Sequence, residues 1–233
     1  MSHDFLLLKC FPTIKCLADL TSSHSSEPQC FITIIVGEGE EAQTFTLHRD
    51  VLSSQTQFFN TANEGKFKEG ETQEVYLEDV EPSVFGLFLI WLYSGGTIPQ
   101  RQIGEKKGDI LNQTPTQLTK LWVLASQFMM PKLQNAVIDE IFCAIEVMFR
   151  DIESLQFTGE THTQLMWPFT EYAYETHTPM LRNLAVDRLA FGCSESVFMD
   201  MVEFLPTEVV VDVAKALRAG IRMCAEDFYF AED

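Results

Sequence analysis

The stretch FTLHRDVLSSQTQFF, residues 45–59, runs from the end of an expected strand into expected helices. Aromatic and β-branched residues, which are typical of strands, occur in its first part. The apolar residues of its second part recur at helical spacings and are Val51, Leu52, Phe58 and Phe59. The pair Ser53-Ser54 predicts a break between two short helices. The stretch therefore indicates a fold in which a strand leads directly into a helical region.

The same stretch contains the tripeptide His48-Arg49-Asp50, which also occurs in the catalytic loop of protein kinases. A kinase requires an Asn five residues after this Asp, where the chain has Gln55, and a D-F-G motif further on, which is absent. The glycine-containing stretch GEGEEA, residues 37–42, lies only a few residues upstream, whereas most of a lobe separates the two motifs in a kinase. The tripeptide therefore predicts no phosphoryl transfer.

Segments with strand composition lie on both sides of this stretch. CFITIIV, residues 30–36, and QTFTLH, residues 43–48, are rich in β-branched and aromatic residues and flank GEGEEA. These two segments predict a β-hairpin. EVYLEDV, residues 74–80, alternates apolar and acidic residues, which is the pattern of a third, half-buried strand.

From Pro82 onward the sequence predicts helices. A Pro at a first helical position introduces four of them, in EPSVFG, TPTQLT, MPKLQN and LPTEVV. The third carries an i, i+4 stripe that we expect to face inward, made of Leu133, Val137, Ile141, Ile145 and Met148. Two more helices are expected near residues 163–176 and 179–191. An exposed loop is expected at residues 96–115, and an acidic, aromatic tail that is only partly ordered follows the last helix.

Composition restricts the kind of partner. The chain has 34 Asp and Glu against 16 Lys and Arg, a formal net charge of -18 at pH 7, and no run of basic residues. Such a surface repels phosphate backbones and anionic lipids, so we expect neither nucleic acid nor a membrane as a direct partner. Basic protein surfaces suit it better.

The six cysteines are scattered without a C-x-x-C pair or a His at zinc-ligand spacing. We expect reduced, mostly buried thiols, as in proteins of the cytoplasm or nucleus. The apolar segment FLLLKCFPTIKCLADL, residues 5–20, is interrupted by Lys9, Pro12 and Lys15 before it reaches the length of a signal-peptide core. It indicates a short amphipathic docking segment instead.

Other enzyme motifs fail in their context. GEGEEA matches the dinucleotide fingerprint G-x-G-x-x-A, but a strand follows it where the fingerprint needs a helix N-terminus. GCSES, residues 192–196, lacks the closing Gly of a hydrolase elbow, and a helix N-cap suits Ser194 or Ser196. We therefore expect no catalytic residue, no cofactor and no metal, and we predict that the protein is not an enzyme.

Taken in order, FITIIVG, FTLHRDVLSSQTQFF and GKFKEGETQEVYLEDVEPSVFGLFLIWLYSGG resemble a BTB/POZ domain, and their phrasing is similar to that of fungal members. The resemblance implies an α+β fold of BTB/POZ type, a small β-sheet flanked by a cluster of α-helices and followed by an α-helical extension. The expected organisation is an N-terminal amphipathic segment and linker at 1–29, the BTB/POZ domain at 30–150, and the extension at 151–233. In this family the residue matching His48 helps to fix the strand-to-helix junction.

The resemblance also implies a function. BTB/POZ domains are protein-interaction modules that make homotypic contacts, and many members recruit a cullin scaffold for ubiquitin ligation. Phe67 and Glu69 match the hydrophobic-x-Glu motif of cullin-binding members, and we expect them to bind the partner together with the helix that starts near Thr116. The protein is thus expected to be a homodimer and a candidate substrate adaptor for a cullin-based ubiquitin ligase. The alternative is a homo-oligomerising scaffold or transcription-associated regulator that does not bind a cullin.

Overall fold

The computed structural model describes residues 30–56, 74–98, 114–155 and 159–230, with the backbone alone between residues 150 and 165. Contacts divide the chain into two units, Met1–Cys30 and Phe31–Asp233. Only Cys30 of the first unit is described, so the fold given below is that of the second unit. The expected amphipathic segment and linker, residues 1–29, lie outside the described residues.

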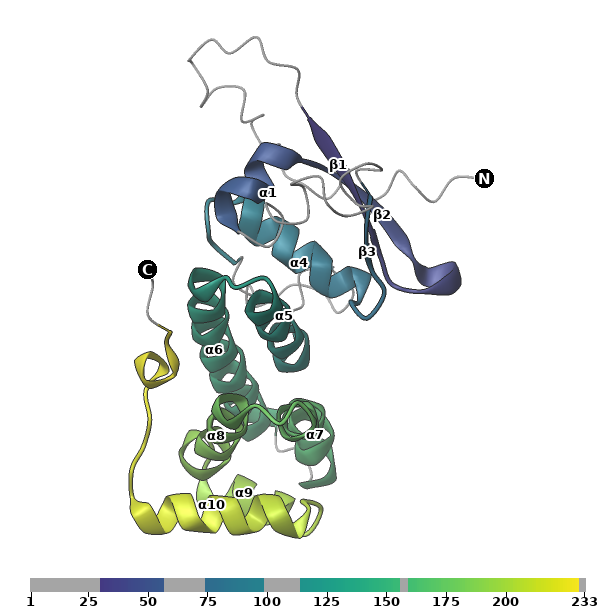
Figure 1. Ribbon diagram of the computed structural model, residues 1–233. Helices are drawn as coiled ribbons and strands as arrows, with labels where there is room; N and C mark the ends of the chain where they lie inside the picture. The colour runs from purple at the N-terminus through teal and green to yellow at the C-terminus, as the bar shows by residue number, and fades with distance from the viewer. Residues whose placement is uncertain (1–29, 57–73, 99–113, 156–158, 231–233) are drawn as a thin grey trace. The chain divides into compact units, whose positions relative to one another are not determined.

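A three-stranded sheet begins the fold, in the strand order β2-β1-β3 (Figure 1). Its strands are β1 (Phe31–Val36), β2 (Gln43–His48) and β3 (Glu74–Leu77). β1 and β2 pair antiparallel across a short 3-10 turn, η3 (Gly39–Glu41), and β3 pairs parallel to the other side of β1. The predicted hairpin and third strand are present, although the third strand ends at Leu77 because the chain turns there, with the Val80 amide donating to the Leu77 carbonyl.

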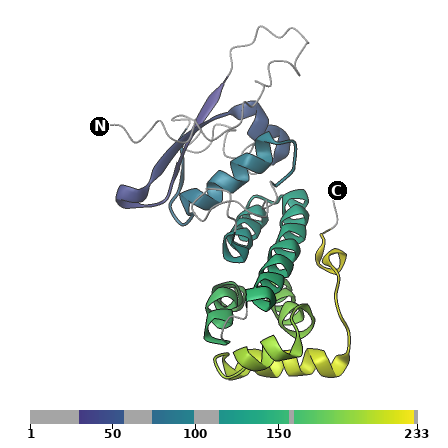
Figure 2. The same ribbon diagram turned by 180° about the vertical axis from the view of Figure 1, so that it is seen from behind.

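The buried face of the sheet packs on helix α4 (Pro82–Tyr93), which lies beside the sheet together with α1 (Arg49–Gln55) in both views (Figures 1 and 2). Ile34 is buried in the middle of β1, and its cross-strand partner Phe45 therefore shares the same face. The Phe45 ring lies 5.0 Å from the ring of Phe85 on α4. The alternation of buried and exposed residues in β1 thus sets which face the helices cover.

Helix α1 corrects one expectation from the sequence. It continues through Ser53 and Ser54 to Gln55, so the break predicted at this pair is wrong. The Ser54 hydroxyl donates to the Val51 carbonyl at 2.8 Å, which satisfies it within the helix, and Leu52 anchors the helix in the core. The second short helix, with Phe58 and Phe59, lies outside the described residues.

Helices α5 (Pro115–Gln127) and α6 (Pro131–Leu155) extend the core that α4 begins. Aromatic rings join α4 to the end of α5. The ring of Phe88 on α4 lies 5.4 Å from the ring of Phe85 on the same helix and 5.5 Å from the ring of Phe128, which follows α5. The core of this part buries Leu52, Phe85, Phe88 and Leu92 and half-buries Leu89. The predicted starts of these helices at Pro82, Pro115 and Pro131 are confirmed.

The inward stripe of α6 is confirmed for its first four residues, which are fully buried, but not for its last. Phe149 is buried and Met148 only half-buried, because Phe149 continues the four-residue spacing from Ile145. α6 also runs without a break across residue 150. The division into a domain at 30–150 and an extension at 151–233 stays a prediction.

The remaining helices differ in detail from the expected pattern. They are α7 (Gly159–Glu175), α8 (Pro179–Asp187), the π-helical turn η4 (Arg188–Gly192), α9 (Glu195–Met201), α10 (Thr207–Ala219) and the 3-10 turn η5 (Ala225–Phe228). The helix expected at 179–191 is therefore two elements, α8 and η4. Pro206 is the N-cap of α10 rather than its first residue, with extended backbone at ψ 144°. Ser194 is the N-cap residue of α9, as expected, but its side chain makes no capping hydrogen bond.

Two further expectations concern the surface. Of the tail expected to be only partly ordered, Ala225 to Phe230 pack against α6, with Phe228 buried there, and residues 231–233 lie outside the described residues (Figure 2). Three of the described cysteines, Cys30, Cys143 and Cys224, are exposed and Cys193 is half-buried, so these thiols are not mostly buried. Cys143 lies two residues beyond Ile141 on α6, which places it away from the apolar stripe.

Candidate interaction surface

The expected partner-binding residues, Phe67 and Glu69, lie outside the described residues, as does most of the loop expected at 96–115. The helix expected near Thr116 is α5, which begins at Pro115. Thr114 caps it, since its hydroxyl accepts from the Gln117 amide at 3.2 Å and the Gln117 side chain accepts from the Thr114 amide at 3.1 Å. The N-terminal turn of α5 is therefore fixed in place.

Most of α5 is unavailable to a partner. Its buried residues are Leu118, Thr119, Leu121, Trp122, Leu124 and Ala125. The exposed side chains of this part of the chain lie at the two ends, at Thr114 and at Ser126, Gln127 and Met129. A partner that binds α5 would thus contact the two ends of the helix rather than its middle.

His48 lies in a small aromatic group at the junction of β2 and α1. Its ring lies 4.9 Å from the Phe31 ring and 3.4 Å, Nδ1 to Oη, from the Tyr93 hydroxyl at the end of α4. His48 is the N-cap residue of α1, but its side chain makes no capping hydrogen bond. The ring therefore ties the junction to α4, which suits the structural role expected for it. The expectation that neither His48 nor Asp50 takes part in catalysis stays a prediction.

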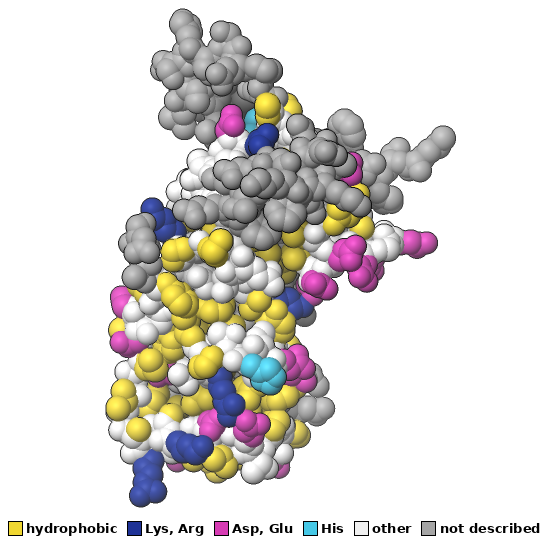
Figure 3. Space-filling model, viewed as in Figure 1, with side chains coloured by type: hydrophobic (Ala, Val, Ile, Leu, Met, Phe, Trp, Pro, Cys, Tyr) yellow, Lys and Arg dark blue, Asp and Glu magenta, His cyan; other side chains and the backbone are white. Residues whose placement is uncertain are grey.

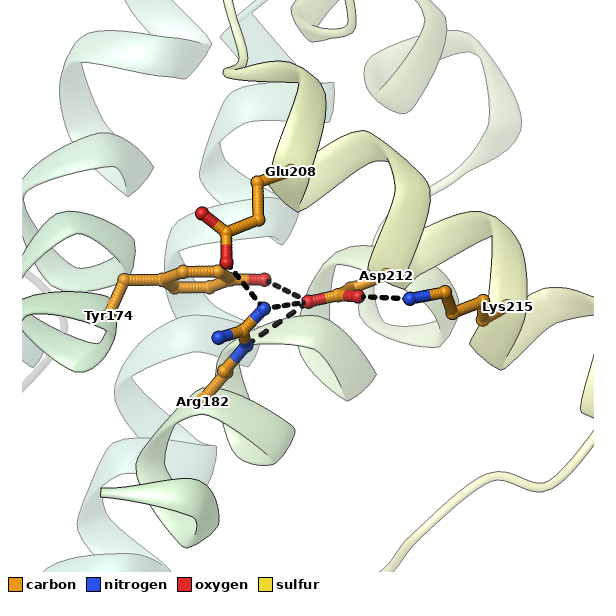
Figure 4. Close-up of polar contacts among 5 residues, drawn as sticks. All are labelled: Tyr174, Arg182, Glu208, Asp212 and Lys215. Atoms are coloured by element: carbon orange, nitrogen blue, oxygen red, sulfur yellow. Dashed lines mark hydrogen bonds and ion pairs between the residues drawn. The ribbon is translucent and has the colours of Figure 1, made fainter. Parts of the chain in front are cut away.

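The C-terminal helices meet in a group of charged side chains from α7, α8 and α10 (Figure 4). Asp212 Oδ2 accepts hydrogen bonds from Arg182 Nε at 3.1 Å, from an Arg182 terminal nitrogen at 2.5 Å and from the Tyr174 hydroxyl at 3.1 Å. Glu208 and Lys215 complete the group, at 2.7 Å from Arg182 and 3.0 Å from Asp212 Oδ1. The guanidinium also lies over the Tyr174 ring, 4.4 Å from its centroid.

The electrostatics of this group favour the charge states found at neutral pH. Hydrogen bonds from Arg182, and then from Lys215 and Tyr174, hold the pKa of Asp212 below its ordinary value. Burial, and then the charge of Asp212, raise the pKa of Tyr174 to about 12. Since Asp212 stays ionised and Tyr174 stays protonated, the group fastens α10 to α7 and α8 rather than exchanging protons.

A second charged pair is buried where α8 passes into the π turn. The side chains of Asp187 and Arg188 are 4% and 2% exposed and form an ion pair. Asp187 Oδ1 also accepts from the Met223 amide at 2.8 Å, and the guanidinium carbon lies 4.0 Å from the centroid of the Phe142 ring. The pair therefore holds the chain after α10 against α6.

Sequence reasoning did not identify either charged group. Tyr174, Arg182 and Asp212 come from three helices, and residue patterns within one helix do not show which faces meet. A partial signal exists in Glu208 and Asp212, which are four residues apart and therefore share one face of α10. Asp187 and Arg188 are adjacent charged residues in the helical segment LRNLAVDRLAFG, and the sequence does not indicate that their side chains are buried.

Apolar side chains gather over the described helices on the face shown in Figure 3, with basic and acidic side chains close together at the end that contains α10. The large apolar side chains exposed in the described C-terminal part are Met199, Phe204, Val211, Leu217, Ile221, Tyr229 and Phe230. Exposed apolar groups among charged ones are suited to contact with another protein.

Neither a metal-binding cluster nor a membrane-spanning helix occurs within the described ranges. No group of three or more His, Cys, Asp or Glu residues there is placed to hold a metal ion. No described helix is long and apolar enough to cross a membrane.

A pocket of about 360 Å³ lies between α6, the π turn and the chain after α10, lined by Phe142, Glu146, Arg188 and residues 222–225.

Comparison with known proteins agrees with the architecture of the first part. A family model of the BTB/POZ domain matches residues 20–142. The chain is 35% identical over 95 residues to the Kelch repeat and BTB domain-containing protein 4 of Homo sapiens, and equally to that of Pongo abelii. The match covers 40% of this chain and 17% and 18% of those two proteins. The chain thus spans less than a fifth of the length of these relatives.

Proposed function

The chain belongs to the BTB/POZ domain family, whose domain is a protein-interaction module, and from this membership we propose that it is a substrate adaptor for a cullin-based ubiquitin ligase. In this proposal Phe67 and Glu69 bind the cullin together with the N-terminal end of α5. Phe67 fills an apolar pocket as an anchor, and Glu69 accepts charge-assisted hydrogen bonds from a basic partner. The net charge of -18 increases the rate of encounter with a basic surface at low salt.

The observation that carries the proposal is the family match over residues 20–142, which includes the motif Phe67-Lys68-Glu69. The capped start of α5 supports it, because a fixed helix end loses little conformational freedom when a partner binds. The similarity to a protein named for kelch repeats and a BTB domain supports an interaction role of the same kind.

A binding assay with a purified cullin N-terminal region tests the proposal. Wild type is expected to bind, and Phe67→Ala and Glu69→Lys are each expected to weaken binding about tenfold or more, as truncation of an interface anchor does. The chain offers a matched control in Glu203 and Phe204, an exposed Glu and Phe after α9 and outside the matched residues. Phe204→Ala and Glu203→Lys are expected to bind as wild type does.

Absence of binding by wild type, or equal binding by all four variants, would exclude the adaptor role. The homo-oligomerising scaffold or transcription-associated regulator would then take its place.

Under either function we propose a homodimer, the three-part division at residues 29/30 and 150/151, and a location in the cytoplasm or nucleus. Six cysteines without a C-x-x-C pair support the location, since such scattered cysteines are typical of proteins in reducing compartments. We also propose that the chain is of the fungal type of BTB/POZ protein, which its sequence resembles.

A further inference from the structure

The C-terminal tail packs on one face of α6 through the 3-10 turn η5 and the two residues that follow it. Asn135 donates from Nδ2 to the Phe230 carbonyl at 3.0 Å and accepts from the Phe230 amide at Oδ1 at 2.8 Å. Both bonds go to the backbone, so the Asn135 side chain recognises an extended chain without regard to the side chain it carries. Asn135 is nearly buried, which strengthens these bonds.

Aromatic side chains of the tail supply the rest of the contact. Phe228 is 2% exposed and its ring lies 5.8 Å from that of Phe142, seven residues after Asn135 on α6. Phe230 lies 5.9 Å from the ring of Trp122 on α5. The Tyr229 hydroxyl, between them in sequence, donates to Asp139. This surface of α5 and α6, called the groove below, thus buries Phe228 and contacts the partly exposed Phe230 two residues later.

The tail fits this groove poorly in charge. The sequence AEDFYFAED has four acidic residues and no basic one, and η5 packs on α6, which carries Asp139, Glu140 and Glu146. Burial, then the hydrogen bond to Asp139 and the charge of Asp139, raise the pKa of the Tyr229 hydroxyl, with a further effect of Glu226. Burial and then Glu140, Glu146 and Asp139 likewise raise the pKa of Cys143. Because η5 and α6 pack on each other and both carry acidic residues, a segment with basic residues suits this surface better in charge than the tail does.

The tail also leaves its site incompletely filled. Residues 222–225 line one side of the pocket of about 360 Å³, and Phe142 and Glu146 of α6 line another. The Trp122 indole N–H is buried and lacks a hydrogen-bond partner among the described residues. Met223 is held separately by Asp187, so residues after it can leave the groove while the chain before it stays in place.

We propose that this groove, defined by Trp122, Asn135, Asp139 and Phe142, binds a segment of a partner protein with the pattern aromatic-x-aromatic and basic flanking residues. The tail is an internal competitor that covers the groove until such a segment displaces it. The aromatic spacing follows from Phe228 and Phe230, and the basic flanks follow from the acidity of α6. This function goes beyond the proposed adaptor role and does not depend on cullin binding.

Fluorescence anisotropy with the full chain and a labelled peptide, AKKFYFAKK, tests the proposal. Phe228→Ala removes the most buried contact of the tail and is expected to raise the affinity for the peptide about tenfold, because the competitor then leaves the groove free. Phe230→Ala, which changes a more exposed residue, is a second opened variant in case Phe228→Ala fails to fold. Adding Asn135→Leu to either opened variant is expected to lower the affinity about tenfold or more, since two hydrogen bonds to the peptide backbone are lost.

Control peptides separate the groove from general attraction of a basic peptide to an acidic protein. AKKAYAAKK keeps the charge without the two Phe side chains and is expected to bind at least about tenfold more weakly. AEDFYFAED keeps the aromatic residues and is expected to bind more weakly than AKKFYFAKK, with a difference that shrinks at high salt. Phe204→Ala, on another exposed aromatic residue, is expected to leave every affinity unchanged. Equal binding of AKKFYFAKK and AKKAYAAKK, or an affinity that none of the tail and groove variants changes, would overturn the proposal.

Discussion

Asn135 and Phe230 are separated by 95 residues and exchange two hydrogen bonds, side chain to backbone, at 2.8 and 3.0 Å. The contact joins the end of the described chain to α6, the long helix of the BTB/POZ chain that also carries its apolar stripe. The contact makes the tail part of the folded structure. In the proposal above, a partner segment competes with the tail for this site on α6.

Asn135→Leu is expected to release the tail. The variant removes both hydrogen bonds while keeping the side-chain volume, so the amides of residues 228–230 should exchange with solvent about tenfold faster in hydrogen-exchange measurements. Asn135→Asp keeps the acceptor for the Phe230 amide and is expected to fall between wild type and Asn135→Leu. Unchanged exchange in Asn135→Leu would show that the aromatic contacts alone hold the tail.

Phe88→Ala is expected to destabilise the domain severely. Phe88 is fully buried between Phe85 and Phe128, and truncating such a side chain costs about 3–5 kcal/mol. This is a large part of the stability of an ordinary domain, so the midpoint of thermal unfolding should fall sharply. Tyr76→Ala, at an exposed aromatic residue of β3, should change the midpoint little. A melting temperature unchanged in Phe88→Ala would contradict the core assignment.

The charged group around Asp212 predicts a pH dependence of stability. The folded-state pKa of Asp212 is lowered, so its contribution is present above the unfolded value near 4 and is lost as pH falls through the folded value. The pKa of Tyr174 is raised to about 12, so its contribution is present below pH 10 and is lost as pH rises from about 10 to 12.

Denaturant unfolding at several pH values checks both limbs. At pH 7, Asp212→Asn is expected to lower the free energy of unfolding by roughly 1–2 kcal/mol, a value reduced because Arg182 is partly exposed. The difference from wild type should shrink below about pH 4. Tyr174→Phe should flatten the alkaline limb. Asp200→Asn, at an exposed residue of α9, should follow wild type throughout, and a constant difference for Asp212→Asn at all pH values would contradict the lowered pKa.

The buried pair Asp187 and Arg188 is expected to be sensitive to loss of one partner. Asp187→Asn or Arg188→Met leaves the other charge buried and unpaired, which costs about 3–5 kcal/mol. The double variant Asp187→Asn with Arg188→Met removes both charges and should recover a large part of this loss. Urea unfolding of the three variants measures the effect, and simple additivity of the single changes would show that the two charges do not interact.

The proposed homodimer predicts a mass twice the 26.5 kDa of the chain by light scattering at micromolar concentration. Deleting residues 1–20 is expected to reduce the mass toward that of the monomer, because the segment carries a run of apolar residues that needs an apolar surface to cover it. Phe204→Ala serves as a control on an exposed aromatic residue outside the segment. A monomer mass for wild type would exclude the dimer.

Local patterns in the sequence were sufficient where a short segment decides its own conformation. Residues 30–36 and 43–48 read as a hairpin because their side chains suit strands and Gly37 lies at the turn, with φ 88° in the structure. Pro at the first helical position located the starts of α4, α5 and α6, because its fixed φ favours helix initiation and the amide it lacks has no helical partner there.

The sequence by itself thus determined the order of strands and helices and the apolar face of α6, since both depend on residues a few positions apart. Only the tertiary structure decided that β3 joins the far side of β1 in parallel, that Asp187 and Arg188 are buried together, and that the tail returns to Asn135. Each of these depends on contacts between residues far apart in the chain. Their free energy comes from burial and hydrogen bonding across elements, and no local residue pattern records which surfaces will meet.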